Sequence, residues 1–142
     1  MAYDQHWSTS EPGPIASTDW CKKITDYAKS QIPQEKLIMG LSFYGRTWRD
    51  DKTGGKAYSY NSIQKIIEEN KIKKHKRDSF GIPSFNIEKK LKITAFYDDE
   101  TSLLFRTKMY AENGIDKISF WRTGQEDKNY WQHLKTLATE EK

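Results

Sequence analysis

Aromatic rings and planar polar side chains occur together at three points of this 142-residue sequence. They are Tyr3, Asp4, Gln5, His6 and Trp7 at the first point, Phe43, Tyr44, Arg46 and Trp48 at the second, and Trp121, Arg122, Gln125, Glu126 and Asp127 at the third. Aromatic faces stack on the apolar faces of pyranose rings, while carboxylate, guanidinium and phenol groups hydrogen-bond to sugar hydroxyl and acetamido groups. The residue types therefore predict a carbohydrate ligand rather than a nucleotide or a metal, and no glycine-rich phosphate loop competes with this interpretation.

The elements that must position these residues alternate between strands and helices. An amphipathic helix is predicted over 18–31, because Trp20, Ile24 and Ala28 recur at helical spacing and Ser17 or Thr18 can cap the helix. The nearly continuous apolar run of 37–43 predicts a strand covered on both faces, as parallel strands are. A connection of about 30 residues suits a crossover between parallel strands.

The middle of the chain reads as a different module. A loop is predicted over 50–55, and Ile63, Ile66 and Ile67 indicate a short helix capped near Ser59 or Asn61. Three candidate strands follow at 71–77, 82–87 and 91–97, which predicts an antiparallel meander with Pro83 near an edge. We therefore expect an α+β insertion at 49–96 between two segments of one α/β unit, 1–48 and 97–142.

The last segment repeats the strand and helix pattern. Asp98 or Asp99 can cap a helix that Asn113-Gly114 closes, 115–121 reads as a strand, and Asp127 can cap a final helix. Parallel strands bring their C-terminal ends to one side of the sheet, so the three groups of candidate residues should meet there. Only three core strands are present, and their unpaired edges predict a homo-oligomer or pairing with a missing N-terminal part.

Several motifs resemble glycoside hydrolase family 18. Met1-Ala2-Tyr3-Asp4 is similar to the end of that family's sixth strand, Tyr44-Gly45-Arg46-Thr47-Trp48 to the segment after the seventh, and Ile118-Ser119-Phe120-Trp121 to the eighth. Phe96-Tyr97-Asp98-Asp99-Glu100-Thr101-Ser102 resembles the unit that closes the fold. The resemblance implies the C-terminal portion of a TIM (β/α)8 barrel, namely its last three β/α units, with an inserted small α+β subdomain. The opening Met-Ala-Tyr-Asp-Gln-His-Trp is similar to spore-cortex or cell-wall glucosaminidase members.

The resemblance also implies a role for each residue. Tyr3 would position the substrate acetamido group, and Asp4, Tyr44, Arg46 and Trp48 would bind the sugar, with Trp121 as the floor and Met1 along the wall. The implied mechanism is substrate-assisted retaining hydrolysis of β-1,4-linked N-acetylglucosamine glycans, either chitin or peptidoglycan, without a cofactor or metal. The family's Asp-x-x-Asp-x-Asp-x-Glu motif, which carries the catalytic acid, is absent from the sequence. We therefore expect this chain alone to be inactive.

Two other functions are compatible with parts of the sequence. A non-catalytic glycan-binding protein, similar to chitinase-like lectins, would keep the same binding residues without the acid. The basic run Lys71-Ile72-Lys73-Lys74-His75-Lys76-Arg77 suggests binding to an anionic polymer, but a solvated strand explains it more simply, and no interleaved aromatic residues offer base stacking. Taken singly, a Tyr-Asp pair or Trp121 is typical of ordinary packing, so the prediction depends on their joint occurrence.

Composition narrows the remaining classes. The net charge of +4 comes from interspersed acidic and basic residues, which is typical of a solvated surface and predicts no nucleic-acid partner. The single cysteine, Cys21, allows no intrachain disulfide and no metal site with paired thiolates. No apolar run reaches the length of about 18 residues that spans a bilayer, so we expect no membrane segment. The compartment stays open.

Overall fold

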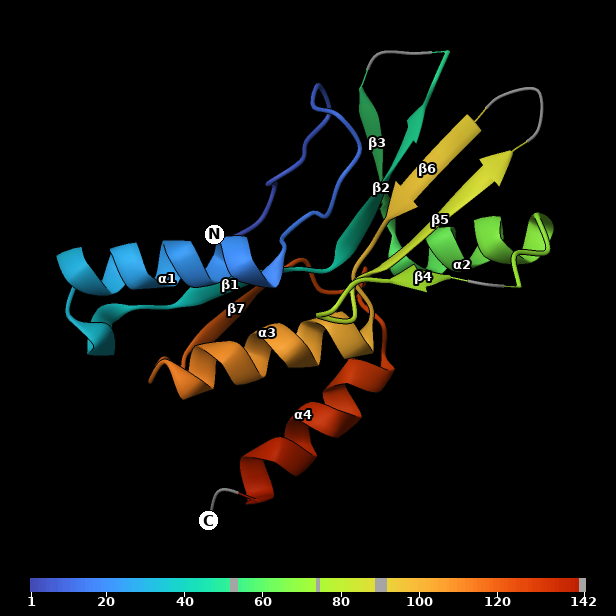
Figure 1. The fold of residues 1–142 in the computed structure, drawn as a ribbon. Coiled ribbons are helices and arrows are strands. Elements are labelled where there is room, and N and C mark those ends of the chain that lie inside the picture. The colour runs from blue at the N-terminus through green and yellow to red at the C-terminus, as the bar shows by residue number, and fades with distance from the viewer. Residues whose placement is uncertain (52–53, 74, 89–91, 141–142) are drawn as a thin grey trace.

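The computed structural model describes residues 1–51, 54–73, 75–88 and 92–140, with side chains described as far as 135. Its strands form two sheets. Strands β1 (Met39–Ser42) and β7 (Ile118–Trp121) make a two-stranded parallel sheet, and five other strands make an antiparallel sheet in the order β3-β2-β6-β5-β4. Figure 1 shows the antiparallel sheet at one end of the molecule and the long helices around the parallel pair at the other.

The parallel part is held together by three helices. Helices α1 (Thr18–Gln31), α3 (Glu100–Glu112) and α4 (Asn129–Glu140) lie beside β1 and β7, and the short 3-10 helix η1 (Gln34–Lys36) leads into β1. Their apolar side chains share one core with the strands, formed by Leu41, Phe43, Leu103, Tyr110, Ile115 and Tyr130 among others. Burial of such a core is the main favourable term in folding.

The predicted helix boundaries are confirmed. Ser17 caps α1 by accepting a hydrogen bond from the Trp20 N–H. Asp99 caps α3 within a capping box in which Ser102 is its partner. Gly114 follows the end of α3 with φ of +74°, the left-handed conformation that glycine adopts without steric cost.

The N-terminal segment lies along β1 without forming a regular strand. The Ala2 N–H donates to the Gly40 carbonyl at 3.3 Å. A side chain at Gly40 would place its Cβ 3.1 Å from the Met1 Cα, so glycine there allows the close approach. The expected first strand is therefore reduced to one backbone contact, which still fixes Tyr3 and Asp4 beside β1.

The antiparallel sheet contains more of the chain than the sequence indicated. The predicted strands at 82–87 and 91–97 are present as β5 (Pro83–Glu88) and β6 (Lys92–Phe96), whereas the one predicted at 71–77 is reduced to the two residues of β4 (Lys76–Arg77). Lys74, Lys89, Lys90 and Leu91 lie outside the described residues. Strand β2 (Tyr44–Arg49) also belongs to this sheet, between β3 (Gly55–Ser59) and β6. Helix α2 (Tyr60–Glu69) follows β3 and is capped by Ser59, one of the two predicted caps.

The sequence placed residues 44–48 after the parallel strand of 37–43, and it predicted no strand over 55–59. The chain instead continues from β1 through Phe43 into β2, so one extended segment serves both sheets. Glycine at position 45 permits this crossing, because a Cβ there would lie 2.3 Å from the Tyr97 Cβ. No helix among the described residues is long and apolar enough to cross a membrane.

A buried ion pair holds the elements of the parallel part together. The Arg106 side chain is fully buried on α3 and donates to Asp98 and, at 2.8 Å, to the Ala16 carbonyl. The Asp98 carboxylate also accepts hydrogen bonds from the hydroxyls of Ser42 and Ser102. These contacts connect α3 with the end of β1 and with the loop that follows the N-terminal segment.

Candidate functional site

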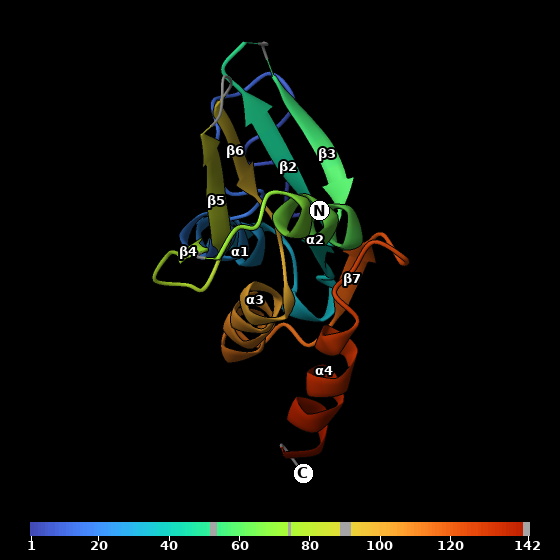
Figure 2. The same cartoon turned by 90° about the vertical axis from the view of Figure 1, so that its right-hand side faces the viewer.

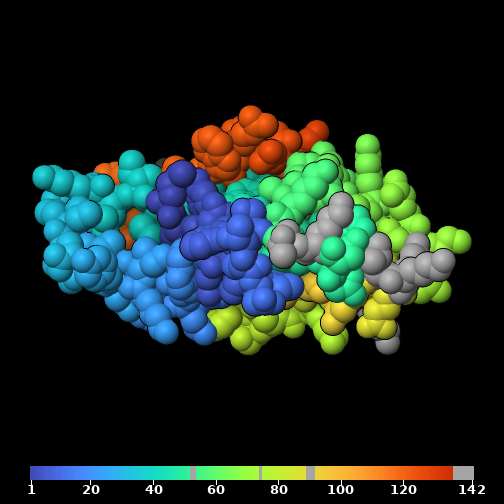
Figure 3. Space-filling model, turned by 90° about the horizontal axis from the view of Figure 1, so that it is seen from above, coloured from blue at the N-terminus to red at the C-terminus, as the bar shows by residue number. Residues whose placement is uncertain are grey.

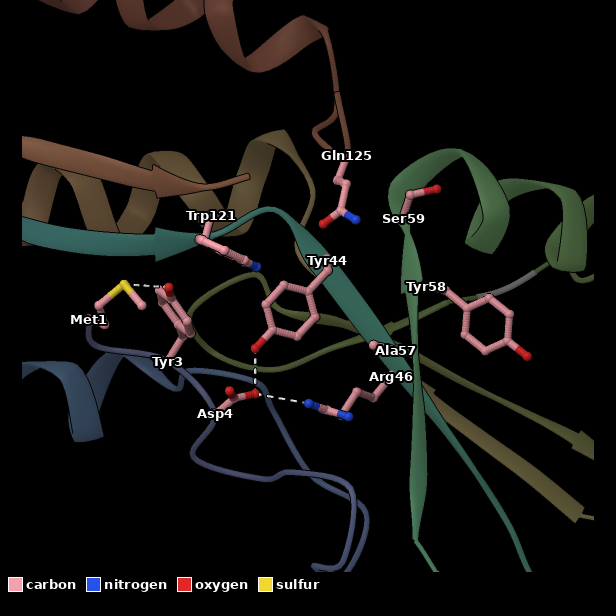
Figure 4. A pocket seen from close by; sticks show the side chains of 10 residues that line it. All are labelled: Met1, Tyr3, Asp4, Tyr44, Arg46, Ala57, Tyr58, Ser59, Trp121 and Gln125. Carbon is pink, nitrogen blue, oxygen red and sulfur yellow. Dashed lines mark hydrogen bonds and ion pairs between the residues drawn. The ribbon is translucent and has the colours of Figure 1, made fainter. Parts of the chain in front are cut away.

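A pocket of about 430 Å³ lies where the two sheets and the N-terminal segment meet. In the view of Figure 3, the N-terminal segment in blue lies next to the orange segment around β7 and the green segment around β3. The pocket is lined by Met1, Tyr3, Asp4, Tyr44, Arg46, Ala57, Tyr58, Ser59, Trp121 and Gln125. These residues come from three parts of the chain, as expected for side chains at the ends of parallel strands (Figure 4).

The centre of the pocket is the Asp4 carboxylate. Its Oδ1 accepts a hydrogen bond from the Tyr44 hydroxyl and another from Arg46 Nη2 at 3.1 Å. Asp4 has φ of +63°, an uncommon backbone conformation that aspartate tolerates better than most residues. Tyr44 and Arg46 are two residues apart on β2, so their side chains lie on the same face of the strand and reach the carboxylate together.

Two further aromatic residues form one wall. The rings of Tyr3 and Tyr44 meet edge to face, with centroids 6.1 Å apart, and the Tyr3 hydroxyl contacts the Met1 sulfur. Trp121 at the end of β7 is 53% exposed, although it lines the pocket, so an indole face is available to a ligand. An accessible indole beside fixed polar groups is the arrangement that suits a pyranose ring.

The electrostatics of the pocket keep its tyrosines as hydrogen-bond donors. Burial, together with the hydrogen bond to Asp4, raises the pKa of Tyr44 well above its ordinary value. Burial and the nearby Asp4 charge also raise the pKa of Tyr3. Both hydroxyls therefore stay protonated at neutral pH, and the Arg46 guanidinium, which lies 5.7 Å from the centre of the Tyr44 ring, balances the Asp4 charge.

Comparison with known proteins identifies the family. The model for "Glycosyl hydrolases family 18" matches residues 1–126. The chain belongs to this family. The expectation drawn from the Tyr-Asp, Tyr-Gly-Arg and Trp121 motifs is thereby confirmed, and the fold is a mixed α/β fold similar to C-terminal portions of family-18 proteins.

Individual relatives include a glycosylase, two cortex-lytic enzymes and a chitinase. The glycosylase YvbX of Bacillus subtilis is 28% identical over 95% of the chain and 40% of its own length, and the cortical fragment-lytic enzyme of Bacillus anthracis is 29% identical over 94% and 33%. The spore cortex-lytic enzyme SleL of Bacillus cereus superimposes with a TM-score of 0.86 at 26% identity, over 95% of this chain and 33% of SleL. A chitinase of Chromobacterium violaceum gives 0.82 at 25%, over 95% and 43%. The chain thus spans less than half the length of each of these family-18 relatives.

Six of the seven candidate residues in this family-18 chain meet in the pocket, and Trp48 does not. Its indole is 4% exposed and donates to the Ser10 carbonyl at 3.0 Å. It lines a separate cavity of about 400 Å³ between the loop at residues 9–12 and the far ends of β2 and β6. The loop covers Trp48, so the structure does not bring it to the ligand side.

The pocket also has a wall that the sequence did not indicate. Ala57, Tyr58 and Ser59 of β3 line it beside Tyr44 and Arg46, which pair with Ser59 and Ala57. No strand was predicted over these residues, so only the pairing of β3 with β2 could have revealed them. Within the described part of the chain, no group of three or more His, Cys, Asp or Glu residues could hold a metal ion.

Proposed function

We propose that the whole protein hydrolyses β-1,4 bonds beside N-acetylglucosamine in chitin or peptidoglycan, and that this chain supplies the sugar-binding half of the active site. In this proposal the chain corresponds to the last three β/α units of a TIM barrel, with residues 49–96 as the insertion. The single observation that carries the proposal is the shared Asp4, Tyr44 and Arg46 contact beside an accessible Trp121. The similarity to a cortical fragment-lytic enzyme and to a chitinase supports the two substrate classes.

The proposed reaction uses the substrate's own acetamido group as the nucleophile. Its carbonyl oxygen attacks the anomeric carbon, the glycosidic bond breaks, and the leaving oxygen takes a proton from a carboxylic acid. Water then opens the resulting oxazolinium ring, which restores the acetamido group and yields the retained anomer. Tyr3, whose hydroxyl stays protonated, would hydrogen-bond the acetamido carbonyl, and Asp4 and Arg46 would hold polar groups of the sugar.

None of the described residues that line the pocket can serve as the proton donor of this reaction. Asp4 is the only carboxylate lining it among the described residues, and its Oδ1 already accepts from Tyr44 and Arg46. The family's Asp-x-x-Asp-x-Asp-x-Glu motif is absent from the sequence. We therefore expect binding without turnover from the 142-residue chain.

Titration of the chain with N-acetylglucosamine oligomers tests the binding half of this proposal. Trp121→Ala should weaken binding about tenfold, because an aromatic contact contributes on the order of 1–1.5 kcal/mol. Trp7→Ala is the matched control, since Trp7 is exposed to 54%, nearly the same fraction, but does not line the pocket. Equal effects of the two substitutions, or no binding by the unmodified chain, would count against the proposed site.

A chromogenic N-acetylglucosaminide tests the missing acid. The purified chain should release no chromophore above the rate seen without protein, and clear turnover would refute the assignment of the acid to residues outside the chain. The second candidate function, a non-catalytic glycan-binding protein, is favoured by the same lack of an acid in the pocket. Turnover by the whole protein distinguishes the two, because only the hydrolase would show it.

A further inference from the structure

The backbone of the loop between β7 and α4 is fixed to the neighbouring elements. The Gln125 carbonyl accepts a hydrogen bond from the Tyr60 N–H at 2.9 Å, and the Gln125 N–H donates to the Arg122 carbonyl at 3.2 Å. Two residues later the Asp127 carboxylate accepts from the backbone N–H groups of Glu100 and Asn129. The loop is therefore attached to the first turns of α2, α3 and α4, which makes the position of Gln125 well defined.

The Gln125 side chain has no partner of its own in the part of the chain that the structure describes. Figure 4 shows its carboxamide pointing into the pocket, between Trp121 and Ser59, on the opposite side from Asp4. The next residue differs, because Glu126 Oε1 accepts a hydrogen bond from the Trp131 indole at 3.2 Å. The loop thus presents a neutral amide to the pocket while its carboxylate is bound to α4.

An unpaired amide in such a place can distinguish one ligand from another. A carboxamide carries both a donor and an acceptor, and a hydroxyl group can satisfy either. A site built to hydrogen-bond a hydroxyl discriminates against the analogue that lacks it, because the polar group of the protein is then left unpaired. On the opposite side of the pocket the Asp4 carboxylate already accepts from Tyr44 and Arg46, whereas the Gln125 carboxamide is free to bond to a ligand.

We propose that Gln125 is a specificity-determining residue, which hydrogen-bonds a ring hydroxyl of the N-acetyl sugar stacked on Trp121. The contact lies on the edge of the sugar that faces away from Asp4. The proposal rests on the proposed function, because it assumes that the pocket holds such a sugar. It adds a neutral recognition group from the loop after β7 to the charged group formed by Asp4 and Arg46.

The contact is tested by removing the Gln125 amide from the protein and one hydroxyl group from the sugar, first separately and then together. Binding of N-acetylglucosamine and of its 3-deoxy, 4-deoxy and 6-deoxy analogues is measured by ligand-observed NMR with the unmodified chain and with Gln125→Met, which keeps the length and loses the amide. The unmodified chain should bind one analogue about 3- to 10-fold more weakly than the parent sugar, the usual range for one hydrogen bond. Gln125→Met should bind the parent sugar and that analogue equally.

Controls separate a hydrogen bond from a change of shape. Gln31→Met changes the same side chain on an exposed position of α1 outside the pocket, and it should leave all affinities unchanged. Gln125→Glu keeps an acceptor oxygen and loses the NH2 donor. If the amide donates to the sugar hydroxyl, this variant should retain only part of the preference for the parent sugar over the deoxy analogue. Circular dichroism of each variant confirms that the fold is intact before the affinities are compared.

These measurements distinguish a failure of the role proposed for Gln125 from a failure of the proposed function. If the unmodified chain binds no N-acetyl sugar, both are overturned. If it binds the sugar, but Gln125→Met weakens the parent and every analogue by the same factor or has no effect, the role of Gln125 is overturned and the sugar site stands. If Gln125→Met abolishes the difference in affinity between the parent sugar and one deoxy analogue, the proposal is supported, and that analogue identifies the hydroxyl that Gln125 contacts.

Discussion

Replacing Arg106 with methionine should destabilise the fold by about 3–5 kcal/mol, the usual cost of leaving one member of a buried ion pair without its partner. The structure places the pair at the severe end, because the Arg106 and Asp98 side chains are 0% and 2% exposed. The substitution also removes the hydrogen bond to the Ala16 carbonyl. A loss of this size is a large part of the 5–15 kcal/mol that stabilises a typical domain.

Urea unfolding followed by circular dichroism measures the effect. Arg49→Met is the matched control, since it breaks an ion pair with Asp51 whose two side chains are 40% and 33% exposed. An exposed pair contributes about 0–1 kcal/mol, so the control should unfold at nearly the same urea concentration as the unmodified chain. The contrast between the two arginines isolates the effect of burial.

A double variant tests the cause. Asp98→Asn combined with Arg106→Met removes both charges, and it should recover a substantial part of the stability lost by Arg106→Met alone. The reasoning would be refuted by a single Arg106→Met variant as stable as Arg49→Met. It would equally be refuted by a double variant that is no more stable than the single one, because the loss would then come from packing rather than from an unpaired charge.

Three further predictions follow from the fold. Burial raises the pKa of Tyr97 and of Tyr130 to about 12, above the value of about 10 for an exposed tyrosine, so their contribution to stability is complete below pH 10 and is lost as the pH rises toward 12. Urea unfolding at increasing pH should show this loss, and a smaller loss in Tyr130→Phe; a flat profile would contradict it. Gly45→Ala should cost about 1–3 kcal/mol, because its Cβ would lie 2.3 Å from the Tyr97 Cβ, and an unchanged melting temperature would show that the crossing of β2 is looser than described. Strand β7 pairs only with β1 in the described part of the chain, so we expect this chain to associate through that edge, and a dispersed monomer in sedimentation velocity would count against it.

Local signals in the sequence predicted the helices well. Ser17 before α1, Asp99 before α3 and Asn113-Gly114 after it are capping residues whose effect depends on neighbouring backbone groups alone. The meander that contains β5 and β6 was predicted because short candidate strands are separated by turn residues such as Ser79-Phe80-Gly81. These elements can be predicted from their own residues, without knowledge of what packs against them.

The elements that were missed depend on distant partners. Strand β3 has no apolar alternation, and it exists through its pairing with β2. Trp48 has the right spacing from Tyr44 and Arg46 to share their face of β2, yet the loop at Ser10 covers it. Sequence spacing gives the face of a strand, but it does not reveal which loop lies across that face.

The passage of one extended segment from β1 into β2 has a consequence for how the protein could be altered. Tyr44 and Arg46 belong to the sheet of the insertion, while Asp4 and Trp121 belong to the parallel part. If the proposed sugar site is correct, the proposed insertion could not be trimmed or exchanged for that of another relative without altering that site. A chimera that takes a foreign insertion from residue 44 onward would replace Tyr44 and Arg46, two of the side chains that we propose bind the sugar.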